Sequence, residues 1–155
     1  MTRTRIVDAA AQGKALRLSA LPTAPQQARG FVAELLDQWH VAAETVEIAE
    51  LVASELVTNA VRHTGRIEGP TEPGATETVT VILVRVGLIC GSVVVEVWDN
   101  STDAPVPNDH PFDLNAEGGR GLFLVRELSK DWGYWFPPMG GKWVWATVKG
   151  HRFRL

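Results

Sequence analysis

The stretch from Thr78 to Trp98 constrains the fold of this chain more than any other. Its first part, TVTVILVRVGL, is β-branched and alternating, and its second part, VVVEVW, has the same character. Runs of this kind are typical of β-strands. Cys90, Gly91 and Ser92 lie between them, and turn formers between two strand-like runs favour a hairpin. We therefore expect two antiparallel strands here.

The remaining elements lie on both sides of this hairpin. Apolar residues at three- and four-residue steps predict a helix over Pro25–Trp39 and a longer one over Ala43–Thr64. The other expected elements are a strand over Lys14–Leu21, a helix over Gly121–Ser129, and a last hairpin made of Trp132–Phe136 and Lys142–Lys149. Strands grouped in hairpins favour an α+β fold. We expect a two-layer sandwich, with a mixed, mostly antiparallel sheet and the helices packed on one face.

Length and charge narrow the class of protein. The chain has 155 residues, which predicts one domain over residues 14–155 after a flexible N-terminal extension over residues 1–13. The formal net charge of -3 argues against a general nucleic-acid binder. A single cysteine, Cys90, forms no internal disulfide and fits a reduced, cytoplasmic setting. The longest apolar run is far shorter than the roughly 18 residues of a membrane helix, so no membrane partner is expected.

Two polar residues interrupt the apolar face of the long helix. Glu55 and Asn59 are one turn apart and fall inside the apolar arc, between Leu51 and Val52. A carboxylate aimed at a core is costly unless something satisfies it. One interpretation is a structural pair bonded to a neighbouring loop or strand. The other is a site where Glu55 deprotonates water or a hydroxyl and Asn59 offers a neutral oxygen to Mg²⁺, with His63 extending the stripe or lying at the surface.

Asp99 follows the second strand of the hairpin directly and begins a long loop that runs to Glu117. A carboxylate at the end of a buried strand can accept a hydrogen bond from an exocyclic amine, which would read adenine. The alternative is a turn, because Asp99, Asn100 and Ser101 are all turn-forming residues.

A glycine-rich turn, GGRGL, comes just before the third helix. Gly119 and Gly121 let the backbone pass close to a ligand, helix N-terminal amides attract phosphate, and Arg120 adds a charged donor. A plain hinge between loop and helix is the alternative. The sequence holds no GxxxxGK[ST] pattern, and no strand leads directly into the turn, so neither a P-loop nor a dinucleotide fingerprint is predicted.

In order and spacing these three features resemble the GHKL ATPase superfamily, which includes gyrase, Hsp90, MutL and the histidine-kinase ATP domain. The runs ELVTNAVRHT and GGRGLFLVREL carry the resemblance, which covers about Lys14–Lys149. Within the superfamily the chain looks most like the small anti-sigma-factor serine kinases and their actinobacterial relatives.

The resemblance implies ATP and Mg²⁺ as cofactors and gives a role to each motif. Glu55 matches the proposed general base, Asn59 the magnesium-binding asparagine, and Asp99 the acceptor of the adenine amine. The remaining cofactor-binding positions that it implies are His63, Ser101, Gly119, Arg120, Gly121, Leu122 and Thr147, with Thr147 similar to the family's threonine near the adenine aspartate. Ser101 departs from the family's pattern, because the first glycine box usually has glycine there.

Three hypotheses of function follow. The first is a serine/threonine protein kinase that acts as an anti-sigma factor or related switch and phosphorylates a STAS-type anti-anti-sigma protein. The second is a nucleotide-binding adaptor that holds its partner without phosphotransfer, and the third is an interaction domain that binds no nucleotide. A sigma factor and a second copy of the chain are further candidate partners, which family likeness alone suggests.

Overall fold

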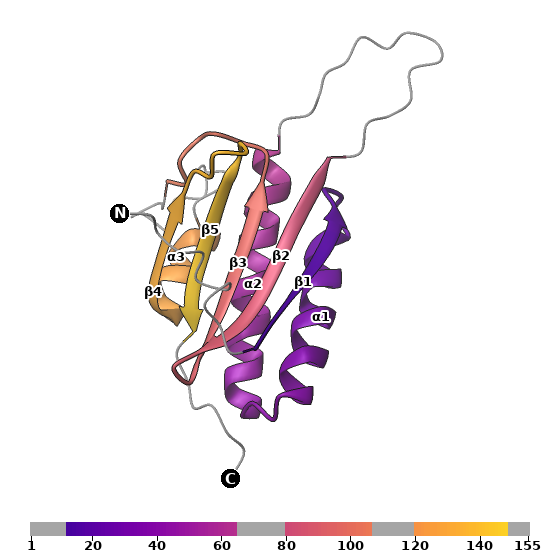
Figure 1. The fold of residues 1–155 in the computed structure, drawn as a ribbon, viewed down its shortest axis with the longest axis vertical. Coiled ribbons are helices and arrows are strands. Elements are labelled where there is room, and N and C mark those ends of the chain that lie inside the picture. The colour runs from indigo at the N-terminus through magenta and orange to yellow at the C-terminus, as the bar shows by residue number, and fades with distance from the viewer. Residues whose placement is uncertain (1–11, 65–79, 107–119, 149–155) are drawn as a thin grey trace, which may run out of the picture.

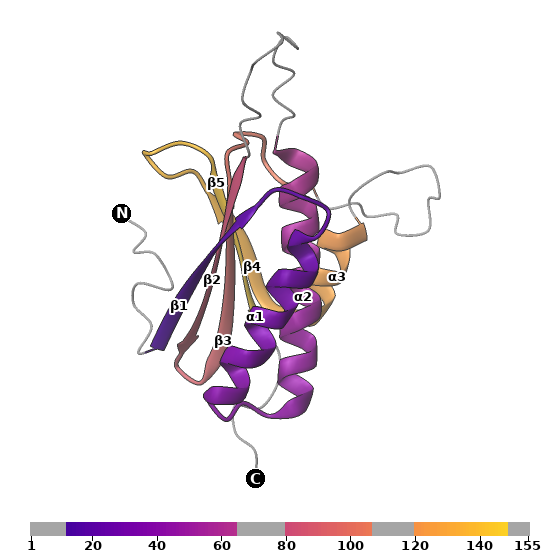
Figure 2. The ribbon, with the colours of Figure 1, turned by 90° about the vertical axis from the view of Figure 1, so that its right-hand side faces the viewer.

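A five-stranded sheet and three helices make up the part of the chain that this computed structural model describes, residues 12–64, 80–106 and 120–148. The helices lie on one face of the sheet, which gives two layers (Figure 1, Figure 2). The elements are β1 (Gln12–Ser19), α1 (Ala24–Gln38), α2 (Ala43–His63), β2 (Val81–Ile89), β3 (Ser92–Asp99), α3 (Arg120–Leu128), β4 (Ser129–Trp135) and β5 (Lys142–Val148). None of these helices is long and apolar enough to cross a membrane.

The strands lie in the order β1-β2-β3-β5-β4, and all four pairings are antiparallel. This confirms the predicted α+β sandwich with a mostly antiparallel sheet, although the described strands contain none of the parallel pairs that a mixed sheet would include. The predicted central hairpin is β2 and β3, joined by Cys90 and Gly91. Both turn residues have positive φ, 48° and 82°, which suits the tight turn of a twisted hairpin.

The fourth strand begins earlier than the sequence predicts. Ser129, expected as the last residue of a helix, is the first residue of β4 and pairs with Val148. Ser129, Lys130 and Asp131 have no strand-like pattern of their own. Their extended backbone comes from pairing with β5, with an irregularity in register between Ser129 and Asp131. Other expected boundaries differ from the observed ones by three residues or fewer.

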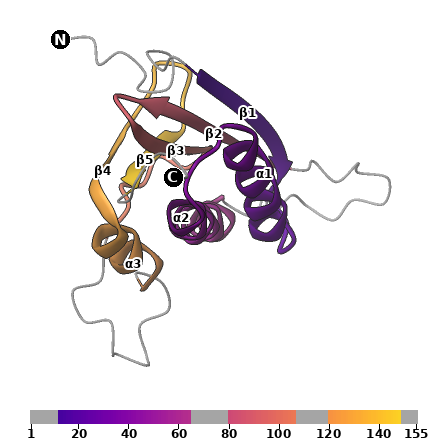
Figure 3. The same cartoon turned by 90° about the horizontal axis from the view of Figure 1, so that it is seen from below.

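The core lies between the sheet and the helices (Figure 3). Alternate residues of the central strands face the helices, as the period of a strand requires. They include Ile82, Val84, Val86, Leu88, Val93, Val95, Val97, Val144, Ala146 and Val148, and the core residues of the helices include Val32, Leu36, Val52, Leu56 and Val57. All of them are nearly inaccessible to solvent, and burying one such aliphatic side chain contributes about 1.5–3 kcal/mol.

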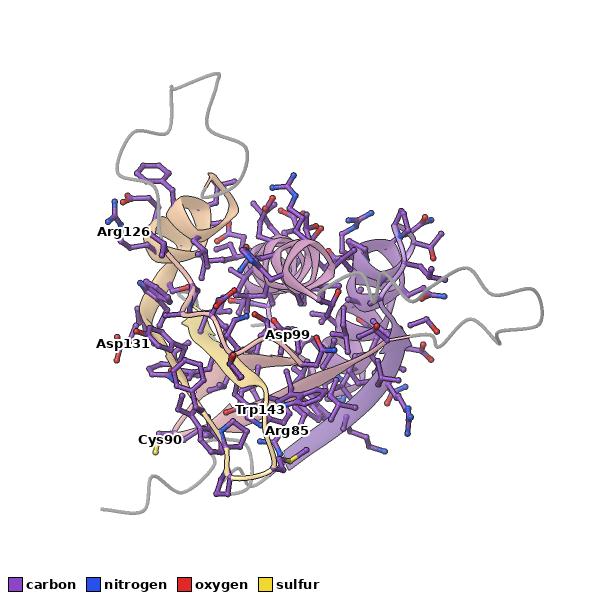
Figure 4. All side chains as sticks on the ribbon, turned by 90° about the horizontal axis from the view of Figure 1, so that it is seen from above. Arg85, Cys90, Asp99, Arg126, Asp131 and Trp143 are labelled. Carbon is purple, nitrogen blue, oxygen red and sulfur yellow. The ribbon has the colours of Figure 1, made fainter. Side chains whose placement is uncertain are left out.

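The opposite face of the sheet carries a separate buried cluster. Arg85 of β2 donates from Nε (3.1 Å) and Nη2 (2.6 Å) to Oε2 of Glu96, its cross-strand partner on β3. The guanidinium carbon of Arg85 also lies 4.2 Å from the ring centroid of Trp143. Figure 4 shows Arg85 and Trp143 on the side of the sheet away from the helices, and Asp99 on the side that faces α2. The two groups of polar residues are therefore separated by the sheet.

Candidate functional site

Helix α2 brings Glu55 and Asn59 to the margin of its buried face. Asn59 is 9% exposed, whereas Glu55 is half-buried. The apolar arc is narrower than predicted, because Leu51 is 41% exposed. A two-layer domain covers a helix on its sheet side and flanks and leaves the outer side to solvent. Glu55 therefore lies at the edge of the core rather than within it.

Asn59 keeps unused hydrogen-bonding capacity. Its side-chain amide makes no hydrogen bond to another residue in the described ranges. A nearly buried amide without an internal partner is suited to an external one. Its oxygen is neutral, which fits Mg²⁺, because this ion takes few protein ligands and completes its shell with water and phosphate oxygens.

The carboxylate of Glu55 lies against the first turn of α3. A Cβ atom added to Gly121 would stand 2.5 Å from Glu55 Oε2, which is closer than a Cβ atom approaches a neighbouring side chain. Glycine at this position is thus what leaves room for the carboxylate. Burial raises the pKa of Glu55, and the positive charge of Arg62 offsets part of this effect. The result is a carboxylate with a higher proton affinity than an exposed glutamate, as a general base requires.

Asp99, the last residue of β3, is buried at 2% exposure beneath the end of α2. Its Oδ1 accepts hydrogen bonds from Lys142 Nζ at 3.0 Å and from the backbone N–H of Ser101 at 2.9 Å. Burial raises the pKa of Asp99, while Lys142, the Ser101 amide and the charge of His63 act in the opposite direction. The carboxylate thus makes the local turn contact and also faces the interior, so the two interpretations of Asp99 are compatible.

Lys142 is the residue that sequence reasoning missed. It is the cross-strand partner of Asp99 at the start of β5 and is itself fully buried. Its position in the strand shows why it points inward, because it is two residues before Val144, which belongs to the core. The glycine pair before it allows the approach: Gly141 has φ of 71°, and a Cβ there would overlap the Asp99 carbonyl and the Trp98 ring.

The other predicted positions lie around these groups. His63, the last residue of α2, is exposed and close enough to Asp99 to influence its charge. Ser101 follows β3, and its Oγ accepts a hydrogen bond from the backbone N–H of Asp103 at 3.2 Å. Leu122 is buried at 2% exposure in the first turn of α3 and belongs to the hydrophobic core. Gly119 and the side chain of Arg120 fall outside the described part of the chain, although Arg120 is the first residue of α3.

The structure does not place Thr147 beside Asp99. The register of β5 pairs Thr147 with Val94, five residues along the strand from the partner of Asp99. At about 3.3 Å per residue this is roughly 16 Å away. Thr147 also alternates with the core residues Ala146 and Val148, so it faces the side of the sheet away from the helices. The residue of β5 that lies beside Asp99 is Lys142.

Comparison with known families matches residues 18–148 to the model of the histidine kinase-like ATPase domain. The chain belongs to this family. The matched span contains α2, the end of β3 and the start of α3, which are the three elements of the candidate site. Membership of a histidine kinase-like ATPase family implies that the domain binds ATP.

A solved structure shares the fold of this ATPase domain. It is the crystal structure of the RsbU and RsbW domains of Rv1364c from Mycobacterium tuberculosis, with a TM-score of 0.60 and 21% sequence identity. The match covers 93% of this chain but only 35% of that one, so the domain spans about a third of the longer protein. No match was found among curated protein sequences.

Proposed function

We propose that this ATPase domain is a serine/threonine protein kinase that binds ATP with Mg²⁺ and acts as an anti-sigma factor or related partner-switching regulator. Its substrate in this proposal is a STAS-type anti-anti-sigma protein. The observation that carries the proposal is the Glu55 carboxylate, which is half-buried against the start of α3, has a raised pKa and lies one turn from Asn59. The likeness in fold to a structure that includes an RsbW domain agrees with it.

The proposed reaction uses the chain's own groups in defined roles. Asp99 would bind the adenine amine through its carboxylate, and the N-terminus of α3 would take the phosphates. Glu55 would accept the proton of the partner's hydroxyl as the hydroxyl oxygen forms its bond to the γ-phosphorus. The bond between that phosphorus and the β–γ bridging oxygen breaks, and ADP leaves with the electron pair. Asn59 would hold Mg²⁺, whose charge offsets that of the phosphates.

Transfer of label from γ-labelled ATP to a panel of STAS-domain proteins tests this proposal. We expect a serine or threonine of one partner to be labelled by the wild type, and labelling to fall by about 10²- to 10⁴-fold in Glu55→Gln, the range typical of a lost general base. Glu47→Gln is the matched control, because Glu47 is exposed on the same helix. Equal labelling by wild type and Glu55→Gln would contradict the role of Glu55, and no labelling of any partner would contradict the kinase.

A second candidate function is an adaptor that binds ATP and sequesters its partner without phosphotransfer. The specific observation is Ser101, which stands where the first glycine box of the family usually has a glycine. Its Oγ accepts a hydrogen bond from the backbone N–H of Asp103. An adaptor would keep both partner binding and regulation in Glu55→Gln, whereas a kinase would keep only the binding.

A further inference from the structure

The pair of Asp99 and Lys142 is unusual for its depth. The side chains are 2% and 1% exposed, and Asp99 Oδ1 lies 3.0 Å from Lys142 Nζ. Taking two charges out of water is expensive, and replacing a buried ion pair by well-packed apolar residues is often neutral or even stabilising. A buried lysine at the end of a strand therefore calls for an explanation in terms of what its charge does to the carboxylate.

The two oxygens of Asp99 are not equivalent. Oδ1 accepts from Lys142 Nζ and from the backbone N–H of Ser101, at 3.0 and 2.9 Å. Oδ2 makes no hydrogen bond to any residue of the described ranges. One oxygen is thus held by two donors from two different elements, while the other remains available. The donors also fix the plane of the carboxylate, which sets the direction in which Oδ2 accepts.

We propose that Lys142 is a positioning residue that sets the specificity of the site for a 6-amino purine, an inference that rests on the proposed function. By holding Oδ1 and keeping Asp99 ionised, Lys142 makes Oδ2 an acceptor only. An amine at purine position 6 donates to such an oxygen. A 6-oxo group offers a second acceptor there, which leaves two buried oxygens facing each other without a hydrogen.

Removing the lysine charge weakens this preference. Asp99 already has a raised pKa because of burial, and Lys142 is the first of the groups that oppose the rise. Without it, the buried carboxyl group takes up a proton at a higher pH. A protonated Oδ2 becomes a hydrogen-bond donor and then suits a 6-oxo purine. The groups that act on Asp99 from the surrounding elements are Lys142 on β5, the Ser101 amide after β3 and His63 at the end of α2.

The test compares ATP with inosine triphosphate, which has an oxo group in place of the 6-amine and a proton on the neighbouring N1, in calorimetric titrations of the wild type and of Lys142→Met. We expect the wild type to prefer ATP on the order of 10- to 100-fold, the value of one well-paired buried group. In Lys142→Met this ratio should fall below that of the wild type, and it should rise again as the pH is raised and Asp99 loses its proton.

Two controls keep the result interpretable. Lys130→Met removes a lysine that is exposed on β4 and bonded to Ser92 Oγ, and it should leave the ratio unchanged. If Lys142→Met does not fold, Lys142→Met is combined with Asp99→Asn, which removes both buried charges. The amide offers a donor as well as an acceptor, so this double variant should also lose the preference.

Each outcome has one meaning. A variant with the wild-type ratio and the wild-type pH profile, whatever its stability, overturns the inference and makes Lys142 a structural residue. A double variant that retains the preference overturns it as well, because the carboxylate would then not select the amine. A wild type that binds neither nucleotide overturns the proposed function and the inference with it, whereas a wild type that binds both equally overturns the inference alone.

Discussion

Replacing Gly121 by alanine should separate catalysis from stability. An added Cβ would stand 2.5 Å from Glu55 Oε2, so the carboxylate must move. The atom in the way is the far end of a flexible side chain, and holding such a side chain about 30° away from its rotamer costs about 0.5–1.5 kcal/mol. Alanine in place of glycine stabilises a helix by about 0.5–1 kcal/mol. We expect the free energy of unfolding to change by less than about 1 kcal/mol from these opposing terms.

The same substitution should abolish most of the phosphotransfer. A Glu55 carboxylate that has moved away cannot accept the proton of the partner's hydroxyl, so the transfer rate should fall by about 10²- to 10⁴-fold. The assay is a cycle of four proteins: wild type, Gly121→Ala, Glu55→Gln and the double variant. If Gly121 acts through Glu55, the double variant is no slower than Glu55→Gln alone. Additive losses, or a loss of more than about 3 kcal/mol of stability in Gly121→Ala, would refute the proposed contact between these residues.

Three further predictions concern the charges and turns of the site. The pKa of Glu55 is raised in the folded state, so its protonated form contributes stability at low pH that is lost as the pH rises through the folded pKa. Chemical denaturation should therefore show Glu55→Gln to be more stable than the wild type at neutral pH. At a pH below 4.5 the variant should show no such gain. Asn59→Ala should raise the Mg²⁺ concentration needed for half-maximal ATP binding while the thermal midpoint stays nearly constant, and an unchanged metal requirement would remove Asn59 from the site. Gly140→Ala should lower the free energy of unfolding by about 1–2 kcal/mol, because of its positive φ alone. Gly141→Ala should lower it clearly more, because of these two glycines only Gly141 would bring a Cβ against neighbouring atoms. Equal melting temperatures of the two variants would argue against the tight approach at Asp99.

Most of the fold can be predicted from the sequence because its elements are periodic. The apolar steps of α2 and the alternation of β2 and β3 are each consistent with only one type of element, and those elements were found where predicted. The start of β4 could not be predicted in the same way. Ser129 and the two residues after it are extended because β5 offers a backbone to pair with, which no local pattern records.

The candidate site could be predicted less completely. Glu55, Asn59 and Asp99 were found from polar residues in apolar surroundings, and the structure places all three on the elements expected. Thr147 was misplaced and Lys142 was missed for the same reason: which residue of β5 lies beside Asp99 depends on the register between β3 and β5. A shift along the strand changes both the partner and the face of the sheet. The signal for Lys142 was its alternation with Val144 and Ala146, which marks the buried side of the strand.

The most direct measurement is a calorimetric titration of Mg-ATP into the wild type and into Asp99→Asn. Asparagine keeps the size of the side chain and one acceptor for Lys142, while an amide nitrogen replaces the second oxygen. Because Lys142 then lacks its buried counter-charge, the titration uses protein whose folding has been verified by circular dichroism. We predict saturable binding to the wild type and binding about tenfold weaker or more to Asp99→Asn. Equal affinity of the two proteins, or no saturable binding to the wild type, would contradict the assignment of Asp99 as the buried acceptor of a nucleotide site.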